Sequence, residues 1–466
     1  MELRGKKIVV MGLGVHGGGL GVARFCAEAG AEVTVTDLRN ADILADSLTA
    51  LADLPITFVL GEHRASDFQQ CDIVVQNPAV PATSPFLAMA RAAGAHIEME
   101  MTLFFRLCPA PIIGITGTKG KTTTSTLTAF LLTAWRPDTV LAGNMRISAL
   151  AQLAHITPTT PVVLELSSFV LEGLGVAGLS PAYAAITNIH PDHLDRYGDM
   201  ASYIAAKAAI GQHQHPHDTL VLQTGDPVLH ELALTMPSHV YWSGTRQPDV
   251  LQRGDTWWQA DTLYCQTATG AQVVAHASDV QLAGLHSRAN VAMAVALVLQ
   301  VGMPVDLIAP ALRRFEGVEH RQERVATING HTFVNDTAAT MPDAAMVALE
   351  CMPKPIIWIA GGADKKLAFS ELAQVATQHA HQIVLLDGTA TPALRSALVE
   401  AGIADRIVGS FDSLAGAVQA AQQVAPHPAT ILLSPGCASF GMFRNEFHRG
   451  EEFRAVVARL GTQEAI

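Results

Sequence analysis

The chain has 466 residues, of which 49% are hydrophobic and 15% are charged. A chain of this length usually divides into several domains, and this composition is typical of well-packed globular proteins rather than disordered ones. The 42 acidic residues outnumber the 30 basic ones and give a net charge of -12, which disfavours a general nucleic-acid or membrane-surface binder because both need a basic face.

The chain opens on a strand-like segment, Ile8 to Met11, instead of the long apolar stretch and cleavage site of a signal peptide. An unbroken apolar run of about eighteen residues, as a transmembrane helix requires, is not found. The six cysteines are far apart in the sequence and form no C-x-x-C pair, so we interpret them as reduced thiols. Together these features predict a cytoplasmic protein that binds neither nucleic acid nor membranes.

The first predicted elements form a strand–helix–strand unit. An apolar strand at 7–14 runs into a helix at 21–30, and a second strand covers 32–37. This order within about thirty residues predicts a βαβ unit and therefore a parallel sheet. Two further strands are predicted at 56–60 and 72–76.

A glycine-rich turn joins the first strand to its helix. Residues Gly12 to Gly17 match the pattern G-x-G-x-x-G, and Asp37 ends the next strand. Alone, this pattern indicates a dinucleotide-binding fold with Asp37 on a ribose, so a nicotinamide-dependent oxidoreductase is one alternative. A tight turn that binds no ligand also fits the pattern.

The rest of the chain repeats the alternation of strands and helices. A second segment starts with a strand at 111–117 and a long helix from Thr122 to about Trp135, and a stretch of mixed hairpin character follows at about 238–282, before a helix at 287–301. This alternation predicts an α/β fold. The remaining predicted strands are short apolar runs: 161–166, 183–188, 218–223, 332–336, 355–362, 382–387 and 430–435.

The strongest chemical signal is the sequence GITGTKGKTTT at 114–124, between a predicted strand and a predicted helix. Gly117 and Gly120 allow the backbone to curl so that its N–H groups face a phosphate at a helix N-terminus. Lys121 would reach the β- and γ-phosphates of a nucleotide, and the Thr122 hydroxyl would bind Mg²⁺. The pattern departs from the standard P-loop at its first position, where Ile115 stands in place of glycine.

Candidate metal ligands follow two other strands of the same segment. Glu165 ends one apolar strand, and His193 lies just after another. The carboxyl ends of parallel strands face the ligand crevice, so both side chains are candidates to join Thr122 at Mg²⁺. Three alternating histidines, at 213, 215 and 217, are interpreted as a solvated loop rather than a metal site.

Together these motifs resemble the Mur ligase family over nearly the whole chain. The matching runs are the P-loop at 116–122, E-L-S-S-F-x-L-E at 165–172 and N-x-x-x-D-H-x-D-R at 188–196. The resemblance implies three α/β domains, and we expect the protein to be a monomer. The implied domains are a Rossmann-like UDP-substrate domain at 1–105, a central P-loop ATPase-like domain at 106–316 and a Rossmann-like amino-acid-binding domain at 317–466.

The resemblance implies an ATP-dependent ligase that adds D-glutamate to UDP-N-acetylmuramoyl-L-alanine through an acyl phosphate, in peptidoglycan precursor synthesis. Another Mur-type or folylpolyglutamate-type ligase is the alternative within this class. An oxidoreductase would leave the second nucleotide loop unexplained. A non-catalytic nucleotide sensor is disfavoured because Glu165, His193 and Lys207 are all present.

The resemblance also carries functional residues onto this chain. Lys207 matches a family lysine that is carbamylated and helps to hold a second Mg²⁺, and its apolar neighbours predict a buried amine of lowered pKa. Catalytic roles fall to Lys121, Lys207, His193 and Arg321. The implied contacts are, for ATP, Gly117, Thr118, Lys119, Gly120, Lys121, Thr122, Thr123, Asn290, Arg321 and Asp336; for Mg²⁺, Thr122, Glu165, His193 and Lys207; for the UDP substrate, Gly14, Val15, His16, Asp37, Arg39, Asn77 and Asn144; and for the amino acid, Thr340, Lys365 and Ser439.

One departure from the family pattern concerns the amino-acid site. The family sequence N-D-S-K-A-T reads Asn335-Asp-Thr-Ala-Ala-Thr340 here, so Ala338 replaces a lysine. The sequence therefore predicts that one charged contact to the amino acid is missing. Arg444 and Lys366 are the nearest cations in the sequence that could replace it.

Overall fold

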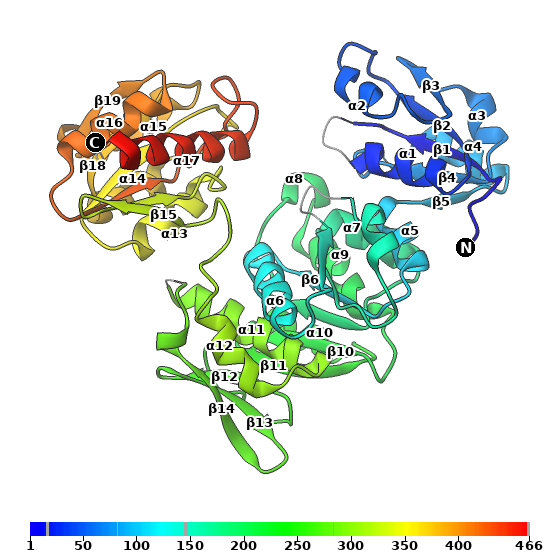
Figure 1. Cartoon of the computed structure of the whole chain (residues 1–466), viewed down its shortest axis with the longest axis horizontal. Helices are drawn as coiled ribbons and strands as arrows, with labels where there is room; N and C mark the ends of the chain where they lie inside the picture. Colours follow the sequence, from blue (N-terminus) through cyan, green and yellow to red (C-terminus); the bar gives the residue numbers. More distant parts are fainter. Residues whose placement is uncertain (15–17, 82, 144–147, 283, 464–466) are drawn as a thin grey trace. The chain divides into compact units, whose positions relative to one another are not determined.

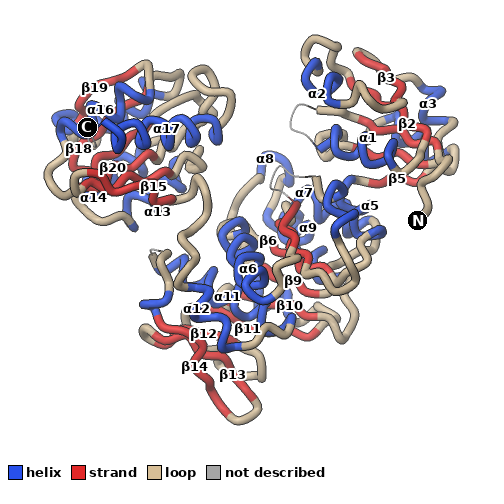
Figure 2. The backbone as a smooth tube through the Cα atoms, viewed as in Figure 1, coloured by secondary structure: helices blue, strands red, loops and turns tan. Residues whose placement is uncertain are grey.

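The computed structural model of the chain describes residues 1–14, 18–81, 83–143, 148–282 and 284–463. The backbone divides into two compact units: unit 1 comprises Met1–Val280 and Leu285–Phe315, and unit 2 comprises Gln281–Gly284 and Glu316–Ile466. Within the described residues the strands form sheets of five, nine and six members, each accompanied by helices (Figures 1 and 2). This is the α/β fold that the sequence predicts.

The first sheet of unit 1 is parallel throughout. Its strands are β1 (Lys7–Met11), β2 (Glu32–Asp37), β3 (Ile56–Leu60), β4 (Ile73–Gln76) and β5 (His96–Glu98), in the order β3-β2-β1-β4-β5. Its helices are α1 (Gly18–Glu28), α2 (Ala45–Ala50), α3 (Ala65–Gln69), α4 (Pro85–Ala92) and α5 (Glu100–Leu107). Ile8 and Val10 enter one apolar cluster and Val9 and Met11 another. Burial on both faces explains why β1 reads as a continuous apolar run.

The second sheet of unit 1 has a parallel core. Its strands are β6 (Ile112–Thr116), β7 (Val140–Gly143), β8 (Val162–Glu165), β9 (Tyr183–Ile186), β10 (Thr219–Gln223), β11 (His239–Gly244), β12 (Thr256–Gln259), β13 (Thr262–Thr267) and β14 (Gly270–His276), in the order β14-β13-β12-β11-β10-β9-β6-β8-β7. The α-helices are α6 (Lys121–Trp135), α7 (Ser168–Val176), α8 (Leu194–Tyr197), α9 (Met200–Gln212), α10 (Pro227–Ala233), α11 (Leu285–Val301) and α12 (Ile308–Leu312), and the 3₁₀ turns are η1 (Leu150–His155), η2 (Ala277–Asp279) and η3 (Val305–Leu307).

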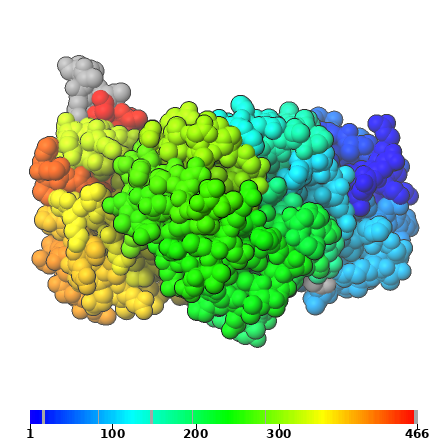
Figure 3. All heavy atoms as spheres, turned by 90° about the horizontal axis from the view of Figure 1, so that it is seen from below, coloured from blue at the N-terminus to red at the C-terminus, as the bar shows by residue number. Residues whose placement is uncertain are grey.

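The stretch predicted at 238–282 to have mixed hairpin character is only partly antiparallel. Strand β11 pairs parallel to β10 and extends the core sheet, because Val240 and Trp242 pack against the apolar cluster of that sheet. Only β12, β13 and β14 form antiparallel pairs. The segment that carries these strands, in green, faces the viewer in Figure 3.

Unit 2 contains the third sheet. Its strands are β15 (Glu323–Ile328), β16 (His331–Asn335), β17 (Ile356–Ala360), β18 (Ala380–Leu386), β19 (Ile407–Phe411) and β20 (Ala429–Leu433), in the order β15-β16-β20-β17-β18-β19. Its helices are α13 (Pro342–Cys351), α14 (Ser370–His379), α15 (Thr391–Glu400), α16 (Leu414–Val424) and α17 (Glu446–Gln463), with the 3₁₀ turn η4 (Ala404–Arg406). Among the described strands of this third sheet, only β15 and β16 pair antiparallel. Ile357 and Trp358 point into apolar clusters on opposite faces.

Several properties of the chain can be compared with the sequence predictions. The six cysteines are all described and none forms a disulfide, which agrees with their interpretation as reduced thiols. No helix in the described ranges combines the length and apolarity needed to cross a bilayer. The predicted domain boundaries after residues 105 and 316 stay predictions.

Candidate active site

The P-loop joins β6 to α6, and its backbone has a shape that requires glycine at two positions. Gly117 has a φ of 147°, and a Cβ atom there would collide with Thr187 Oγ1. Gly120 has a φ of 86°, and a Cβ atom there would collide with Asn290 Oδ1. Other side chains would be strained at these angles, so the loop needs both glycines. Asn290, on α11 and one of the predicted ATP contacts, lies directly against this loop.

A segment after β9 holds the P-loop in place. The N–H group of Thr118 donates to the Asn188 carbonyl at 2.9 Å, and that of Lys119 donates to Asn188 Oδ1 at 2.9 Å. The sequence predicts that the loop N–H groups face a phosphate, whereas in this structure Asn188 accepts those of Thr118 and Lys119. The N–H groups in the first turn of α6, which carries Thr122 and Thr123, are unpaired within the helix and are further candidates to face a phosphate.

Two lysines share one backbone acceptor in this loop. Lys121 Nζ donates to the Gly117 carbonyl at 2.9 Å and to the Thr118 carbonyl at 3.0 Å. Lys207 Nζ donates to the same Gly117 carbonyl at 2.8 Å. Lys207 lies on α9 and its side chain is buried, as its alanine-rich surroundings predict. Burial, together with the charge of Lys121, lowers the pKa of Lys207 to about 7.

Tyr203 connects these groups and was not predicted to be functional. It lies one helical turn before Lys207, whose Nζ is 4.8 Å from the centre of the tyrosine ring. The hydroxyl of the buried Tyr203 lies 3.2 Å from Thr118 Oγ1. The Tyr203 ring meets the His193 ring edge to face, with 6.3 Å between the ring centres. An aromatic residue four positions before a buried lysine is the only sequence signal that could have indicated this contact.

The E-L-S-S-F-x-L-E sequence at 165–172 and the N-x-x-x-D-H-x-D-R sequence at 188–196 contact each other close to Tyr203. Arg196 forms an ion pair with Glu172 at 2.8 Å and lies 4.4 Å above the centre of the Phe169 ring. The same Phe169 ring contacts His193 at 5.3 Å. The E-L-S-S-F-x-L-E and N-x-x-x-D-H-x-D-R sequences are therefore structurally coupled through Phe169, Glu172 and Arg196.

The candidate metal ligands differ in exposure. Glu165 is buried at the end of β8, whereas the His193 side chain is 47% exposed and its backbone φ is 53°. Among the described residues, no group of three or more His, Cys, Asp or Glu side chains is placed to hold a metal ion. The predicted set therefore depends on Thr122 and Lys207 in addition to Glu165 and His193.

The three alternating histidines lie in an exposed loop. His213 Nε2 lies 3.0 Å from the Gly175 carbonyl, and the rings of His215 and His217 stack at 5.5 Å. The exposure of all three side chains agrees with the solvated loop expected from the sequence.

The described part of the N-terminal glycine loop, residues 12–14, follows β1 and lies beside the carboxyl ends of β2 and β4. Asp37 Oδ2 accepts from the Gly14 N–H at 3.1 Å, and its Oδ1 accepts from the Arg39 N–H at 2.9 Å. Asn77 Nδ2 donates to the Gly12 carbonyl at 3.5 Å. The structure thus brings together Gly14, Asp37, Arg39 and Asn77. The other residues predicted at this site, Val15, His16 and Asn144, lie outside the described residues.

In unit 2, Asp336 follows β16 and is buried. Its Oδ2 accepts from the Ser434 hydroxyl at 2.6 Å, and its Oδ1 accepts from the Gln322 N–H at 3.1 Å. Burial raises the pKa of Asp336 to about 7, and the charge of Arg321 opposes this shift. Arg321 is exposed and lies between two residues of positive φ, His320 and Gln322. The nucleotide contacts of Asp336 and Arg321 stay predictions.

The three residues predicted to hold the amino acid come from loops that follow β16, β17 and β20. Lys365 Nζ lies 3.5 Å from Thr340 Oγ1. Ala363 and Ala438 exchange backbone hydrogen bonds of 2.8 and 3.2 Å, which joins the lysine loop to the Ser439 loop. The buried Ser439 hydroxyl has no hydrogen-bond partner among the described residues. Such a group is rare in a folded protein and is expected where a ligand supplies the missing partner.

Comparisons with known proteins cover nearly the whole chain. The sequence matches the Mur ligase MurD-like N-terminal domain at 6–98, the Mur ligase middle domain at 115–298 and the Mur ligase glutamate ligase domain at 320–437. A UDP-N-acetylmuramoylalanine–D-glutamate ligase from a Roseiflexus species is 54% identical, over 98% of this chain and 99% of the relative. A ligase of the same name from Treponema pallidum is 36% identical over 98% of each chain.

Solved structures agree on the fold. The UDP-N-acetylmuramate–alanine ligase of Thermotoga maritima matches with a TM-score of 0.60 and 20% identity, over 98% of this chain and 100% of that one. A pseudomurein peptide ligase type C from Methanothermus fervidus gives a TM-score of 0.58 and 17% identity over the same shares. At these identities the likeness establishes the fold alone, but the sequence relatives reach further. The chain belongs to the Mur ligase family.

Proposed function

We propose that this Mur ligase uses ATP to join D-glutamate to UDP-N-acetylmuramoyl-L-alanine, as a step of peptidoglycan precursor synthesis in the cytoplasm. Mur ligases are ATP-dependent enzymes that form amide bonds. Relatives named for the D-glutamate reaction share 54% and 36% of their residues with this chain. The observation on this chain that carries the proposal is the meeting of the Thr340, Lys365 and Ser439 loops in unit 2.

The chemistry of these three side chains suits an amino acid with two carboxylates. Lys365 offers an ammonium group, and Thr340 and Ser439 offer hydroxyl donors. The buried Ser439 hydroxyl lacks a partner among the described residues, so a bound carboxylate would satisfy it. D-glutamate carries two carboxylates and one ammonium at neutral pH, and it needs donors for both carboxylates.

The first chemical step of the proposal activates a carboxylate. A carboxylate oxygen of UDP-N-acetylmuramoyl-L-alanine attacks the γ-phosphorus of ATP, the bond from phosphorus to the ADP oxygen breaks, and an acyl phosphate forms. Negative charge builds on the transferred group, and Lys121 offsets it after exchanging the Gly117 and Thr118 carbonyls for phosphate oxygens.

The second step forms the amide bond. The amine of D-glutamate attacks the acyl carbon, a tetrahedral intermediate forms, and the bond from carbon to the phosphate oxygen breaks. The amine loses a proton to solvent as phosphate leaves. Phosphate is a far better leaving group than oxide, which is why the carboxylate is activated first.

The proposal includes Mg²⁺, and the residues present fit this ion provided that Lys207 carries a carbamate. The Thr122 hydroxyl and the Glu165 carboxylate supply the oxygen ligands that Mg²⁺ prefers, and His193 supplies a nitrogen. An amine such as Lys207 does not suit Mg²⁺, but its carbamate does, because the carbamate presents oxygens. The pKa of about 7 leaves part of Lys207 as the neutral amine that reacts with CO₂. When bound, Mg²⁺ would neutralise charge on the phosphates.

The remaining assignments concern the two nucleotides and the division of the chain. We propose that the N-terminal domain at 1–105 binds the uridine nucleotide, the central domain at 106–316 binds ATP and the C-terminal domain at 317–466 binds the amino acid, in a monomeric protein. The proposed uridine-nucleotide contacts are Gly14, Val15, His16, Asp37, Arg39, Asn77 and Asn144. The proposed ATP contacts are Gly117, Thr118, Lys119, Gly120, Lys121, Thr122, Thr123, Asn290, Arg321 and Asp336, with Thr118 and Lys119 acting through atoms other than their backbone N–H groups.

An amino-acid panel tests the proposal. Purified protein with ATP, Mg²⁺ and UDP-N-acetylmuramoyl-L-alanine should release phosphate and form the ligated product fastest with D-glutamate. If L-glutamate, L-lysine or diaminopimelate is at least tenfold better, the amino-acid assignment is wrong although the ligase assignment survives. If a reduced folate replaces the uridine substrate and is extended with glutamate, the chain is instead a folylpolyglutamate-type ligase.

A further inference from the structure

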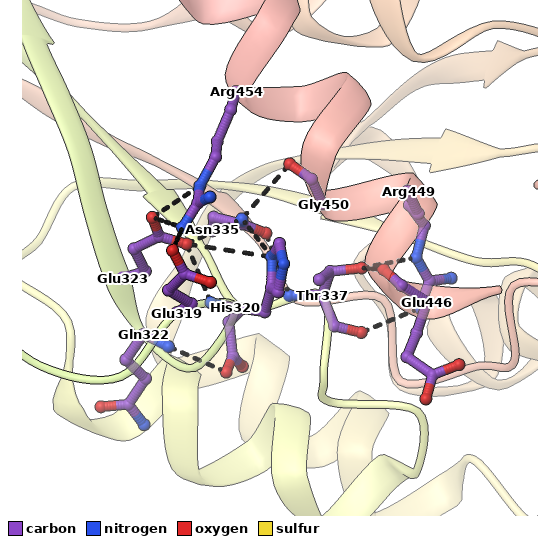
Figure 4. Close-up of polar contacts among 11 residues, drawn as sticks. Glu319, His320, Gln322, Glu323, Asn335, Thr337, Glu446, Arg449, Gly450 and Arg454 are labelled. Carbon is purple, nitrogen blue, oxygen red and sulfur yellow. Dashed lines mark hydrogen bonds and ion pairs between the residues drawn. The ribbon is translucent and has the colours of Figure 1, made fainter. Parts of the chain in front are cut away.

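Arg449 is an arginine whose side chain is completely buried, in the first turn of α17. Its Nε donates to Thr337 Oγ1 at 2.9 Å, and its Nη2 donates to the Thr337 carbonyl at 3.0 Å (Figure 4). Nη1 and Nη2 both donate to the Cys437 carbonyl at 3.3 Å, and Nη1 also donates to the Ala438 carbonyl at 3.4 Å. The guanidinium therefore joins α17 to the Thr337 turn and to the loop that ends at Ser439.

These contacts are unusual for a buried cation. Buried arginines are normally paired with carboxylates, because removing a charge from water is costly. Arg449 has no carboxylate among its hydrogen-bond partners in the described part of the chain. Arg454, five residues further along α17, shows the ordinary arrangement, since it pairs with Glu319 at 3.2 Å and with Glu323 (Figure 4).

The charge on Arg449 survives its burial. Desolvation lowers the pKa of Arg449 to about 10, so the guanidinium stays protonated at neutral pH. The adjacent Cys437 thiol does not neutralise it, because burial raises the pKa of that thiol to about 12. The protonated guanidinium thus donates five hydrogen bonds, to Thr337 and to the two residues that precede Ser439.

The loop that Arg449 holds is the one that links the predicted amino-acid contacts. The carbonyls of Cys437 and Ala438 belong to the residues two and one positions before Ser439. Ala438 also pairs with Ala363, two positions before Lys365, and the Gly436 N–H donates to the Ala339 carbonyl at 2.9 Å, next to Thr340. A shift of the Cys437–Ala438 backbone would therefore move the Ser439 hydroxyl relative to both other contacts.

We propose that Arg449 is a positioning residue for the amino-acid substrate, which holds the Ser439 loop so that the buried hydroxyl and Lys365 meet the two carboxylates of an acidic amino acid. The inference rests on the proposed function and adds to it a residue that touches no substrate. The planar fork of the guanidinium is essential, because a single ammonium cannot hold three carbonyls and a hydroxyl together.

The test separates the guanidinium fork from the charge. Arg449→Lys keeps the charge and loses the fork, so the D-glutamate KM should rise on the order of tenfold to a hundredfold, while the KM values for ATP and the uridine substrate change less than twofold. Arg459→Lys, the same substitution at an exposed position of α17, serves as the matched control and should leave all three KM values unchanged.

A double-mutant cycle distinguishes positioning from general loosening of the fold. Ser439→Ala removes no protein hydrogen bond in the described chain, and alone it should raise the D-glutamate KM. If Arg449 acts through Ser439, the double variant should be little worse than the poorer single variant. Fully additive effects, or a wild-type D-glutamate KM in Arg449→Lys, would overturn the inference.

Two further arms keep the test decisive. If Arg449→Lys does not fold, Thr337→Val, which loses the Nε acceptor, replaces it in the cycle, with Thr337→Ser as the control that retains the hydroxyl. The wild type is assayed first: absence of D-glutamate-dependent phosphate release overturns the proposed function and this inference together. A normal wild type with an unaffected or additive Arg449→Lys overturns the inference alone.

Discussion

Unit 1 and unit 2 each bury a cation beside a backbone carbonyl, and the two cations behave differently. Lys207 donates one hydrogen bond, to the Gly117 carbonyl, and burial lowers its pKa to about 7. Arg449 donates five, to Thr337, Cys437 and Ala438, and its pKa stays at about 10. The lysine is thus poised to lose its proton, whereas the arginine keeps it.

The difference shows how residue type decides the use of a buried charge. A primary amine that becomes neutral is a nucleophile, so the protein can change it chemically. A guanidinium does not become neutral near pH 7, and its planar fork is suited to fixing several acceptors at once. The burial of Lys207 therefore favours chemical modification of its amine, whereas the burial of Arg449 favours positioning of the backbone groups that it binds.

The largest effect is expected from Lys121→Ala, which removes the cation beside Lys207. Ligation should fall on the order of a thousandfold or more, because the phosphates lose their charge partner. Binding of UDP-N-acetylmuramoyl-L-alanine should be almost unchanged, since the proposal places that nucleotide in the N-terminal domain. Calorimetry and a phosphate-release assay measure the two quantities, and an equal loss of both would contradict the separation of the two nucleotide sites.

Lys207→Ala tests the chemical use of the buried amine. We expect activity to fall on the order of a hundredfold or more because a metal ligand is lost, and formate or acetate should partly restore it by occupying the vacated site. Lys207→Arg is the control, since it keeps the charge but cannot form the carbamate, and it should remain inactive. A fully active Lys207→Ala whose parent carries a bare ammonium at high resolution would refute the carbamate.

A smaller effect is expected from adding a cation near the proposed amino-acid site. Ala338→Lys restores the family lysine two positions before Thr340 and should lower the D-glutamate KM by up to about tenfold, or leave it unchanged if Arg444 or Lys366 already supplies that contact. Steady-state kinetics with varied D-glutamate measure it. An increase in KM would show that the region does not accept a second charge.

The smallest effect concerns stability and pH. Between pH 7 and about 10.5 the unfolded chain binds a proton on residue 207 that the folded chain does not, so the free energy of unfolding should increase with pH in this window. In CO₂-free buffer the Tm of the wild type relative to Lys207→Met should therefore rise from pH 7 to pH 9, on the order of a few degrees. A constant Tm difference would mean that Lys207 keeps its proton as Arg449 does.

Much of the fold follows from patterns that are local in the sequence. The predicted strands at 32–37 and 56–60 coincide with β2 and β3, because each is a short run rich in β-branched residues that is bounded by turns. The strands β5, β7, β15 and β19 were not predicted. Strand β19 is only half-buried along most of its length, so its sequence carries no clear alternation or apolar run.

Within the site, the sequence indicates residue types but not the hydrogen bonds that use them. The burial of Lys207 was predictable from the alanines around it. That Asn188 accepts the N–H groups of Thr118 and Lys119 was not, because an asparagine that bonds backbone far away in sequence has no pattern of its own. Arg449 was missed for a different reason: arginines are almost always at the surface, so a sequence argument assigns them there.

The unsatisfied hydroxyl of Ser439 affects which variants directed evolution for heat resistance would select. A hydroxyl buried without a partner among the described residues costs free energy that an alanine would not, so Ser439→Ala should leave the folded protein as stable as before or more so. Selection of variants for heat resistance alone would therefore enrich changes at this position and discard the amino-acid site. Only a screen that couples survival to cell-wall synthesis would retain the serine.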